Sequence, residues 1–124
     1  MSYMLVNKRC RTMKNYIVVT AWKGGAQRGN RDWSKFTYGI RIKKRDRDAL
    51  FSRTWSYVIL VIEDKYYIRV KIADSFWKNC SEFRHKLFKH YFREKGYIPW
   101  PRRHPPKFIL VHEEDNVFKL YPLD

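Results

Sequence analysis

Two segments of the N-terminal half have the pattern of β-strands, one through its β-branched and aromatic residues and the other through alternation of hydrophobic and polar positions. Residues 16–22 are rich in β-branched and aromatic side chains and run into Gly24 and Gly25, so we expect a strand that leads into a loop. Residues 36–43 alternate strictly, which predicts a second strand with its basic side chains facing outward. The following residues, 45–51, predict a short helix.

Two pairs of strand-like segments predict hairpins, because each pair flanks a short polar turn. Residues 55–62 and 66–72 are separated by Glu-Asp-Lys, and the second of these segments alternates apolar side chains with Tyr, Arg and Lys. Residues 108–112 and 117–121 flank a turn rich in Glu and Asp. Both pairs are expected to be antiparallel.

Between the two hairpins, apolar residues recur at spacings of three and four, which predicts one long helix over residues 75–95. Asp74 or Ser75 would cap its first turn, and Gly96 would end it. The prolines of residues 97–107 exclude a helix or a central strand there. The apolar stripe of the predicted long helix consists of Phe76, Cys80, Phe83, Leu87 and Tyr91.

These elements predict a single basic α+β domain over residues 1–124, with a mainly antiparallel, curved or barrel-like sheet of about five to seven strands, one long helix and one short helix. The composition, with 44% hydrophobic and 18% aromatic residues, supplies enough apolar side chain for a core. Residues 1–15 form a basic N-terminal arm that we expect to be partly flexible.

The chain lacks the unbroken apolar run of a membrane span or a signal peptide, so we expect a cytoplasmic, intracellular protein that is not secreted. A membrane partner is not expected, because neither end carries an amphipathic helix or a lipidation signal. Cys10 and Cys80 are expected to be reduced thiols, with a single disulfide between them as the less favoured alternative. The histidines show no ligand spacing with the cysteines, so neither a metal nor a cofactor is expected.

The charge balance makes a polyanion the expected partner. The chain carries 27 Lys and Arg against 12 Asp and Glu, a formal net charge of +15. Such an excess opposes a compact fold through self-repulsion unless a partner neutralises it. Residues 1–53 hold 14 of the basic and 3 of the acidic residues, so we expect a nucleic-acid-binding surface that lies mainly in the N-terminal half.

Three groups of residues are candidates for contact with nucleic acid. The loop over residues 24–31 combines glycines, which let backbone N–H groups approach phosphates, with arginines that donate paired hydrogen bonds. A basic cluster follows the second predicted strand, and the outer face of the predicted long helix carries further lysines. An exposed tryptophan next to them would stack on an unpaired base. The candidates are Arg28, Arg31, Trp33, Arg41, Lys43, Lys44, Arg45, Arg47, Arg53, Lys86 and Lys89.

The first hypothesis is therefore a non-enzymatic protein that grips the phosphate backbone. Double-stranded DNA is favoured over RNA, because a domain this small needs most of its aromatic side chains for its core. The alternatives are a small nuclease, either a metal-free ribonuclease or an Mg²⁺ enzyme that uses Glu63 or Asp64 with Lys71, and a basic partner of a ribonucleoprotein or an acidic protein. No catalytic residue is assigned, and the oligomeric state stays open.

Overall fold

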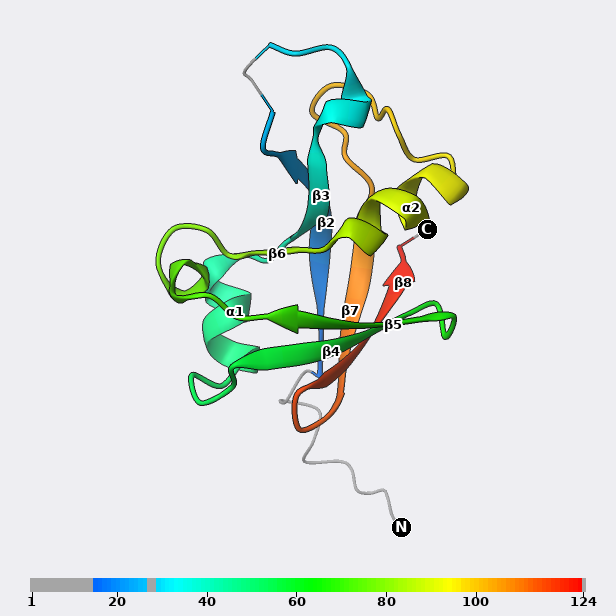
Figure 1. The fold of residues 1–124 in the computed structure, drawn as a ribbon. Coiled ribbons are helices and arrows are strands. Elements are labelled where there is room, and N and C mark those ends of the chain that lie inside the picture. The colour runs from blue at the N-terminus through cyan, green and yellow to red at the C-terminus, as the bar shows by residue number, and fades with distance from the viewer. Residues whose placement is uncertain (1–14, 27–28, 124) are drawn as a thin grey trace.

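The computed structural model describes residues 15–26 and 29–123, drawn in colour in Figure 1. The predicted basic arm, apart from Asn15, and the candidate residue Arg28 lie outside the described residues. The described strands are β2 (Tyr16–Gly24), β3 (Thr37–Arg41), β4 (Tyr57–Ile62), β5 (Tyr66–Lys71), β6 (Glu82–Arg84), β7 (Lys107–Glu114) and β8 (Val117–Pro122). The described helices are α1 (Lys44–Leu50) and α2 (Lys86–Glu94), with short 3₁₀ turns η2 (Trp33–Lys35) and η3 (Asp74–Trp77).

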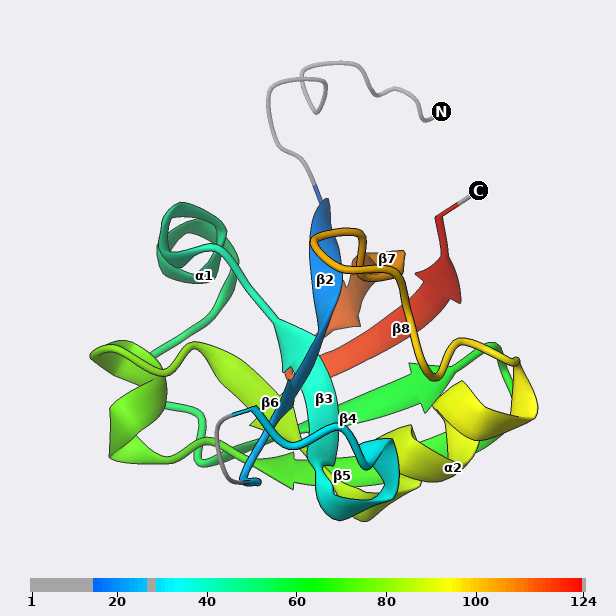
Figure 2. The same cartoon turned by 90° about the horizontal axis from the view of Figure 1, so that it is seen from above.

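The strands form one mixed sheet in the order β5-β4-β8-β7-β2-β3-β6. The described pairs are antiparallel except β4–β8, which is parallel. The sheet curls until its edge strands β5 and β6 approach each other, so it resembles a nearly closed barrel (Figures 1 and 2). The expected barrel-like sheet is confirmed, and its mainly antiparallel character is confirmed apart from the β4–β8 pair.

The interior of the barrel is filled by alternate residues of the strands. In β3 the side chains of Tyr38 and Ile40 are buried, whereas Arg41 is exposed. Two ring pairs stack inside the core, with centroids 4.7 Å apart for Phe51 and Phe118 and 4.8 Å apart for Phe76 and Phe83. Phe51 follows α1 and Phe76 lies in η3, whereas Phe83 and Phe118 lie in strands, so the aromatic core joins the sheet to α1 and η3.

Most of the locally predicted elements are confirmed. The short helix over residues 45–51 corresponds to α1, and the two predicted hairpins correspond to β4–β5 and β7–β8. Gly96 follows α2 with a φ of 73°, a conformation that glycine adopts without a steric penalty. Residues 97–106 form no helix or strand, as the prolines predict. None of the helices in the described ranges is both long and apolar enough to cross a bilayer.

The predicted long helix over residues 75–95 is wrong. In its place the chain forms η3, a loop, the short strand β6 and the nine-residue helix α2. Leu87 N donates to Nδ1 of His85 over 3.1 Å, so His85 caps α2 instead of Asp74 or Ser75. Cys80 and Leu87 of the predicted stripe are only half-buried.

Pairing with a distant strand explains why this segment is not one helix. Ile40 in β3 lies opposite Phe83 in β6, and Ile42 N donates to Ser81 O over 2.8 Å. The Ser81 hydroxyl also donates to Ile42 O over 2.6 Å. These bonds hold the chain extended between η3 and α2, and the helical spacing of its apolar residues is overridden by tertiary contacts.

Candidate nucleic-acid interface

Basic side chains line three adjoining hollows, one on the β4–β5 hairpin, one across the seam between β5 and β6, and one between β3 and the start of α2. The first hollow is lined in part by Arg69 and Lys71, the second by Lys71 and Arg84, and the third by Arg84, Lys86 and Lys89. Lys71 lines the first two hollows and Arg84 lines the last two, so neighbouring hollows share a cation. We call these five residues the basic track.

Strand periodicity and the junction between β6 and α2 build the track. Buried apolar residues of β5 alternate with Arg69 and Lys71, whose side chains therefore face outward. In β6 the buried Phe83 is followed by the exposed Arg84. The helix α2 begins directly afterwards, and its two track lysines are three positions apart, so they lie on neighbouring turns of one face.

Arg84 lies over an aromatic ring two strands away, and the residue between them is a glycine. Gly39 in β3 is opposite Trp22 on one side and opposite Arg84 on the other. A Cβ atom at Gly39 would lie 1.9 Å from the carbonyl oxygen of Phe83, so only glycine allows β6 to approach this closely. The guanidinium carbon of Arg84 is 4.9 Å from the centroid of the Trp22 ring, a cation–π contact.

A second arginine of the track is held in the same way. The guanidinium carbon of Arg69 is 3.9 Å from the centroid of the Tyr57 ring, on the outer face of the β4–β5 hairpin. A cation–π contact at an exposed site contributes about 0.5–1 kcal/mol, enough to bias the orientation of the guanidinium group. The arginines of the track are therefore positioned before any ligand arrives.

One carboxylate, Glu82, lies among the described residues that line the three hollows. Its side chain is 5% exposed and pairs with Arg41 over 3.1 Å and with Arg84 over 3.5 Å. Two cations share a single buried acid, so the second hollow keeps an excess of positive charge. The acidic β7–β8 turn lies at the end of the molecule away from η2 and α2 (Figure 1).

The third hollow, which we call the α2 cleft, has a volume of about 500 Å³ between β3 and the start of α2. Phe36 and Tyr38 line it but are buried, and Lys23 Nζ lies 4.1 Å from the centroid of the Phe36 ring. The Tyr38 hydroxyl donates to Trp33 O over 2.6 Å, so the polar atom of this ring is already satisfied. Lys89 Nζ donates to Ser34 O and thereby ties η2 to the rim of the cleft.

His85 also lines the α2 cleft, and its protonation state is set by its surroundings. Burial lowers the pKa of His85 below its usual 6.5, and the neighbouring Lys86 lowers it further. The ring is therefore neutral at pH 7. Because Nδ1 accepts from Leu87 N, Nε2 carries the ring proton and is a hydrogen-bond donor.

The structure corrects the expectation that Arg47 contacts nucleic acid, because its side chain is buried and is not available to a ligand. The residue is 5% exposed, and its Nη1 donates to Phe76 O over 2.9 Å. Its Nε pairs with Asp48, also over 2.9 Å. Arg47 therefore fastens α1 to η3, a structural role that a basic cluster read along the sequence does not reveal.

Four other candidates lie around α1 and not beside the track. Lys43, Lys44 and Arg45 are exposed at the start of α1, which both views place apart from α2 (Figures 1 and 2). Arg53 is exposed, and its guanidinium carbon is 4.4 Å from the centroid of the Trp77 ring. These four cations therefore lie on a separate surface around α1.

The loop before η2 borders the α2 cleft. Arg31 is exposed there, while Trp33 is half-buried and packs edge-on against Trp100 with ring centroids 5.0 Å apart. Trp33 is thus part of an aromatic cluster and does not present an open stacking face. The bond from Lys89 to Ser34 keeps η2, which follows this loop, close to α2.

Sequence reasoning found part of the track. Lys86 and Lys89 belong to it, and Arg41 borders it through Glu82. The three track residues of β5 and β6 were missed. The alternation in residues 66–72 was a usable signal for Arg69 and Lys71, but Arg84 was hidden by the incorrect assignment of a helix.

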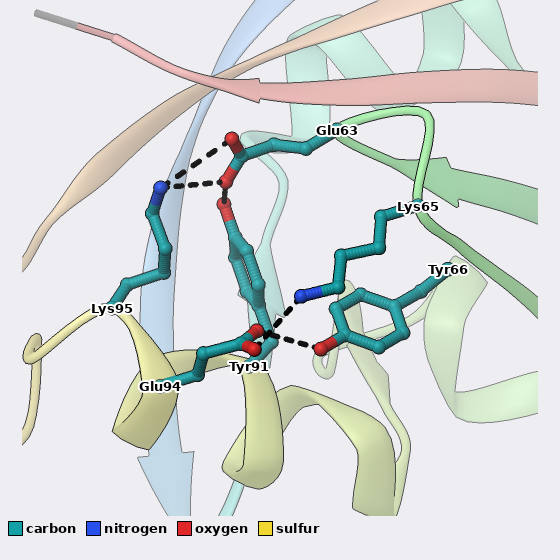
Figure 3. Close-up of polar contacts among 6 residues, drawn as sticks. All are labelled: Glu63, Lys65, Tyr66, Tyr91, Glu94 and Lys95. Carbon is teal, nitrogen blue, oxygen red and sulfur yellow. Dashed lines mark hydrogen bonds and ion pairs between the residues drawn. The ribbon is translucent and has the colours of Figure 1, made fainter.

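A second polar cluster joins the β4–β5 turn to α2 (Figure 3). Glu63 accepts a hydrogen bond from the Tyr91 hydroxyl and pairs with Lys95 over 3.4 Å. Burial and the bond to Glu63 raise the pKa of Tyr91 above its ordinary value of 10.0. Each acidic residue here has both a basic and a phenolic partner, so the cluster is compensated in charge.

The other acidic residue of this cluster is Glu94 (Figure 3). It accepts from Lys65 Nζ over 2.8 Å and from the Tyr66 hydroxyl over 2.6 Å. These two hydrogen bonds lower the pKa of Glu94 below 4.5. The cluster therefore links the hairpin turn to the helix most strongly when Glu94 is ionised.

The acidic residues considered for an Mg²⁺-dependent nuclease do not meet Lys71. Glu63 pairs with Lys95, and Asp64 pairs with Lys119 over 3.7 Å. Lys71 lies opposite Tyr57, at the far end of the hairpin from the turn. Within residues 15–26 and 29–123, no three His, Cys, Asp or Glu side chains are grouped so that they could hold a metal ion.

Comparison of the chain with protein-family models, with curated proteins and with solved structures finds no match.

Proposed function

We propose that this protein binds nucleic acid, without cleaving it, by gripping the phosphate backbone through the basic track, and that double-stranded DNA is its preferred form. The observation that carries the proposal is the succession of cations across the seam, where Lys71 is shared by the first two hollows and Arg84 by the last two. A row of cations on two strands and a helix can contact several phosphates of one strand at the same time.

The surroundings of the track support phosphate contacts over stacking on bases. The rings of Trp22 and Tyr57 are covered by the guanidinium groups of Arg84 and Arg69. Each guanidinium group still has donors in its plane for a phosphate oxygen. Glu82 is almost fully buried, so no exposed carboxylate of the described lining repels a phosphate.

A binding titration at several salt concentrations tests the proposal. With five cations in contact, the association constant for a short blunt DNA duplex should fall with salt with a log–log slope of about −4 to −5. Substitution of Arg69→Gln together with Arg84→Gln should reduce the magnitude of this log–log slope by about 2. It should also lower the affinity for the duplex more than about tenfold at moderate salt. Fluorescence anisotropy measures both quantities.

The matched control removes two cations outside the track that are already paired with acids. Lys65 pairs with Glu94, and Lys119 pairs with Asp64. The double substitution Lys65→Gln and Lys119→Gln therefore removes two positive charges, as the first double variant does, but from the turn of the β4–β5 hairpin and from the neighbouring strand β8. This control should bind DNA within about threefold of the wild type. Equal losses in the two double variants, or a flat salt dependence, would contradict the proposed role of the track.

A further inference from the structure

We propose that a second copy of this chain covers the outer face of strands β2, β7 and β8, with the two copies packed face to face and their β7 strands antiparallel. The inference goes beyond the proposed function, because this face lies away from the basic track. β7 is the middle strand of the sheet order, whereas β5 and β6 are its two ends. Since the sheet curls until these ends approach each other, the outer face of β7 points away from the seam that carries the track.

The middle strand of this face carries apolar side chains on both of its sides. In β7 the buried Phe108 and Leu110 alternate with Ile109 and Val111, which therefore point outward and are half-buried. A strand with one side in water normally alternates apolar with polar residues, whereas a continuous apolar run is typical of a strand that is covered on both sides. The sequence of β7 thus indicates a partner on its outer side.

The neighbouring strands extend this apolar surface. Tyr16 and Val18 of β2 are 45% and 39% exposed, and they lie opposite Val111 and Ile109. On the other side of β7, Tyr121 of β8 lies opposite Ile109. Exposed apolar side chains that adjoin on three strands are typical of a site of protein association.

The charges at the two ends of β7 make the face complementary to itself. Its outward positions are, in order, Lys107, Ile109, Val111 and Glu113, and both charged residues are exposed. A two-fold axis in the plane of the interface, crossing β7 midway between Ile109 and Val111, places Lys107 of each copy over Glu113 of the other. Neither charged residue forms an ion pair within the described ranges, so both are available to a partner.

The same axis matches β8 to itself. Tyr121 lies opposite Ile109 of β7, and Lys119 lies opposite Val111. The axis therefore places Tyr121 of one copy over Lys119 of the other. An aromatic ring packs well against the apolar stem and the ammonium group of a lysine.

The face is balanced in charge although the whole chain carries +15. Tyr121 and then Glu113 raise the pKa of Lys119, so the Glu113 carboxylate is close to that outward-facing lysine. Asp64 pairs with Lys119 over 3.7 Å. Together with Lys107, these residues give the face two lysines and two acids. Repulsion between the copies therefore comes from distant cations, and salt at about 0.15 M screens exposed charges beyond about 8 Å.

Sedimentation of the DNA-free protein at about 0.15 M salt, over a range of concentrations, tests the inference. Three short strands make a small interface, so the dimer should dissociate with a constant of about 1–100 μM. Lys107→Glu alone, or Glu113→Lys alone, places like charges opposite each other twice and should raise this constant more than about tenfold. The double reversal, Lys107→Glu with Glu113→Lys, restores both opposite-charge pairs and should return the constant to within about threefold of the wild type.

The matched control is Lys43→Glu, which makes the same change in net charge as Lys107→Glu at the exposed start of α1. It should leave the dissociation constant within about threefold of the wild type. Circular dichroism checks that each variant is folded.

A monomer at every concentration overturns the inference and leaves the face to a partner other than a second copy. A dimer that neither single reversal weakens overturns it too, and so do single reversals that the double reversal does not rescue. If the reversed variants do not fold, amide chemical shifts of the wild type decide. Raising the concentration should perturb residues 16–18, 107–113 and 117–121, and perturbation of other residues alone overturns the inference.

Discussion

The guanidinium group of Arg84 lies on the indole ring of Trp22 although the two residues belong to strands that are not neighbours in the sheet. The strand between them places Gly39 in the same row, and its missing side chain lets the backbone of β6 come close to β3. Gly39 thus sets how closely β6, which carries the central cation of the track, packs against β3.

Substitution of Gly39→Ala should destabilise the fold and disorder the track together. The new methyl group would collide with the carbonyl of Phe83, and overpacking of this kind costs about 1–3 kcal/mol. Thermal unfolding measures the loss, and DNA titration should show weaker binding even below the melting temperature. Gly29→Ala is the control: a Cβ there meets nothing within 4 Å, so only the strain of its positive φ, about 1 kcal/mol, is expected. Equal effects at the two sites would show that crowding at β6 is not the cause.

Arg47→Ala should reduce stability without reducing affinity for DNA. It would leave the carbonyl of Phe76 without its buried donor, at a cost of about 1–3 kcal/mol in the free energy of unfolding. Arg45→Ala changes the same charge at an exposed position of the same helix and should leave stability within about 0.5 kcal/mol. Chemical denaturation distinguishes the two. A large loss of affinity in folded Arg47→Ala would restore that residue as a binding candidate.

The cap of α2 should make stability depend on pH in the range below neutrality. The folded pKa of His85 is below 6.5, so the neutral ring is favoured in the folded state and protonation favours unfolding. The contribution of neutral His85 to the free energy of unfolding is fully present above pH 6.5, and it is lost as the pH falls from 6.5 through the folded pKa. His85→Ala should lower the free energy of unfolding by about 1 kcal/mol at pH 7, because the cap of α2 is lost. Asparagine also caps helices, so His85→Asn should keep most of this stability and should not show the pH dependence. Melting curves between neutral and mildly acidic pH check this, and a histidine-like profile in the Asn variant would refute it.

A second pH dependence should arise from Glu94 at lower pH. Its folded pKa lies below 4.5 because of Lys65 and then Tyr66, so its contribution is present above pH 4.5 and is lost as the pH falls through the folded pKa. The difference in melting temperature between wild type and Glu94→Gln should therefore shrink on acidification. Glu113→Gln, at an exposed position of β7, should give a small difference at every pH. If the difference in melting temperature between wild type and Glu94→Gln stayed constant with pH, ionisation of Glu94 would not stabilise the fold.

Local pattern was sufficient for the elements whose partners lie nearby in the chain. The hairpins β4–β5 and β7–β8 were predictable because alternation and a polar turn occur within the same short segment. The helix α1 and the glycine after α2 were predictable for the same reason. Among the site residues, Lys86 and Lys89 were found because they are basic and lie in a segment that is helical at that point.

The elements that local pattern misassigned depend on distant partners. Residues 76–91 carry a helical spacing, yet their middle becomes β6 because β3, some forty positions earlier, offers backbone hydrogen bonds and a place for Phe83 in the core. Arg47 is buried because η3 packs against α1, and the parallel β4–β8 pair joins strands from the two hairpins.

The sequence by itself determined the excess of positive charge, the strand periodicity and the turns, because each is a property of one residue or of a few consecutive residues. Only the tertiary structure decided that the basic side chains of β5, β6 and α2 form one track with a cleft at its end. That arrangement exists because the sheet curls until its two edge strands approach each other, and this closure depends on contacts between segments that the sequence keeps apart.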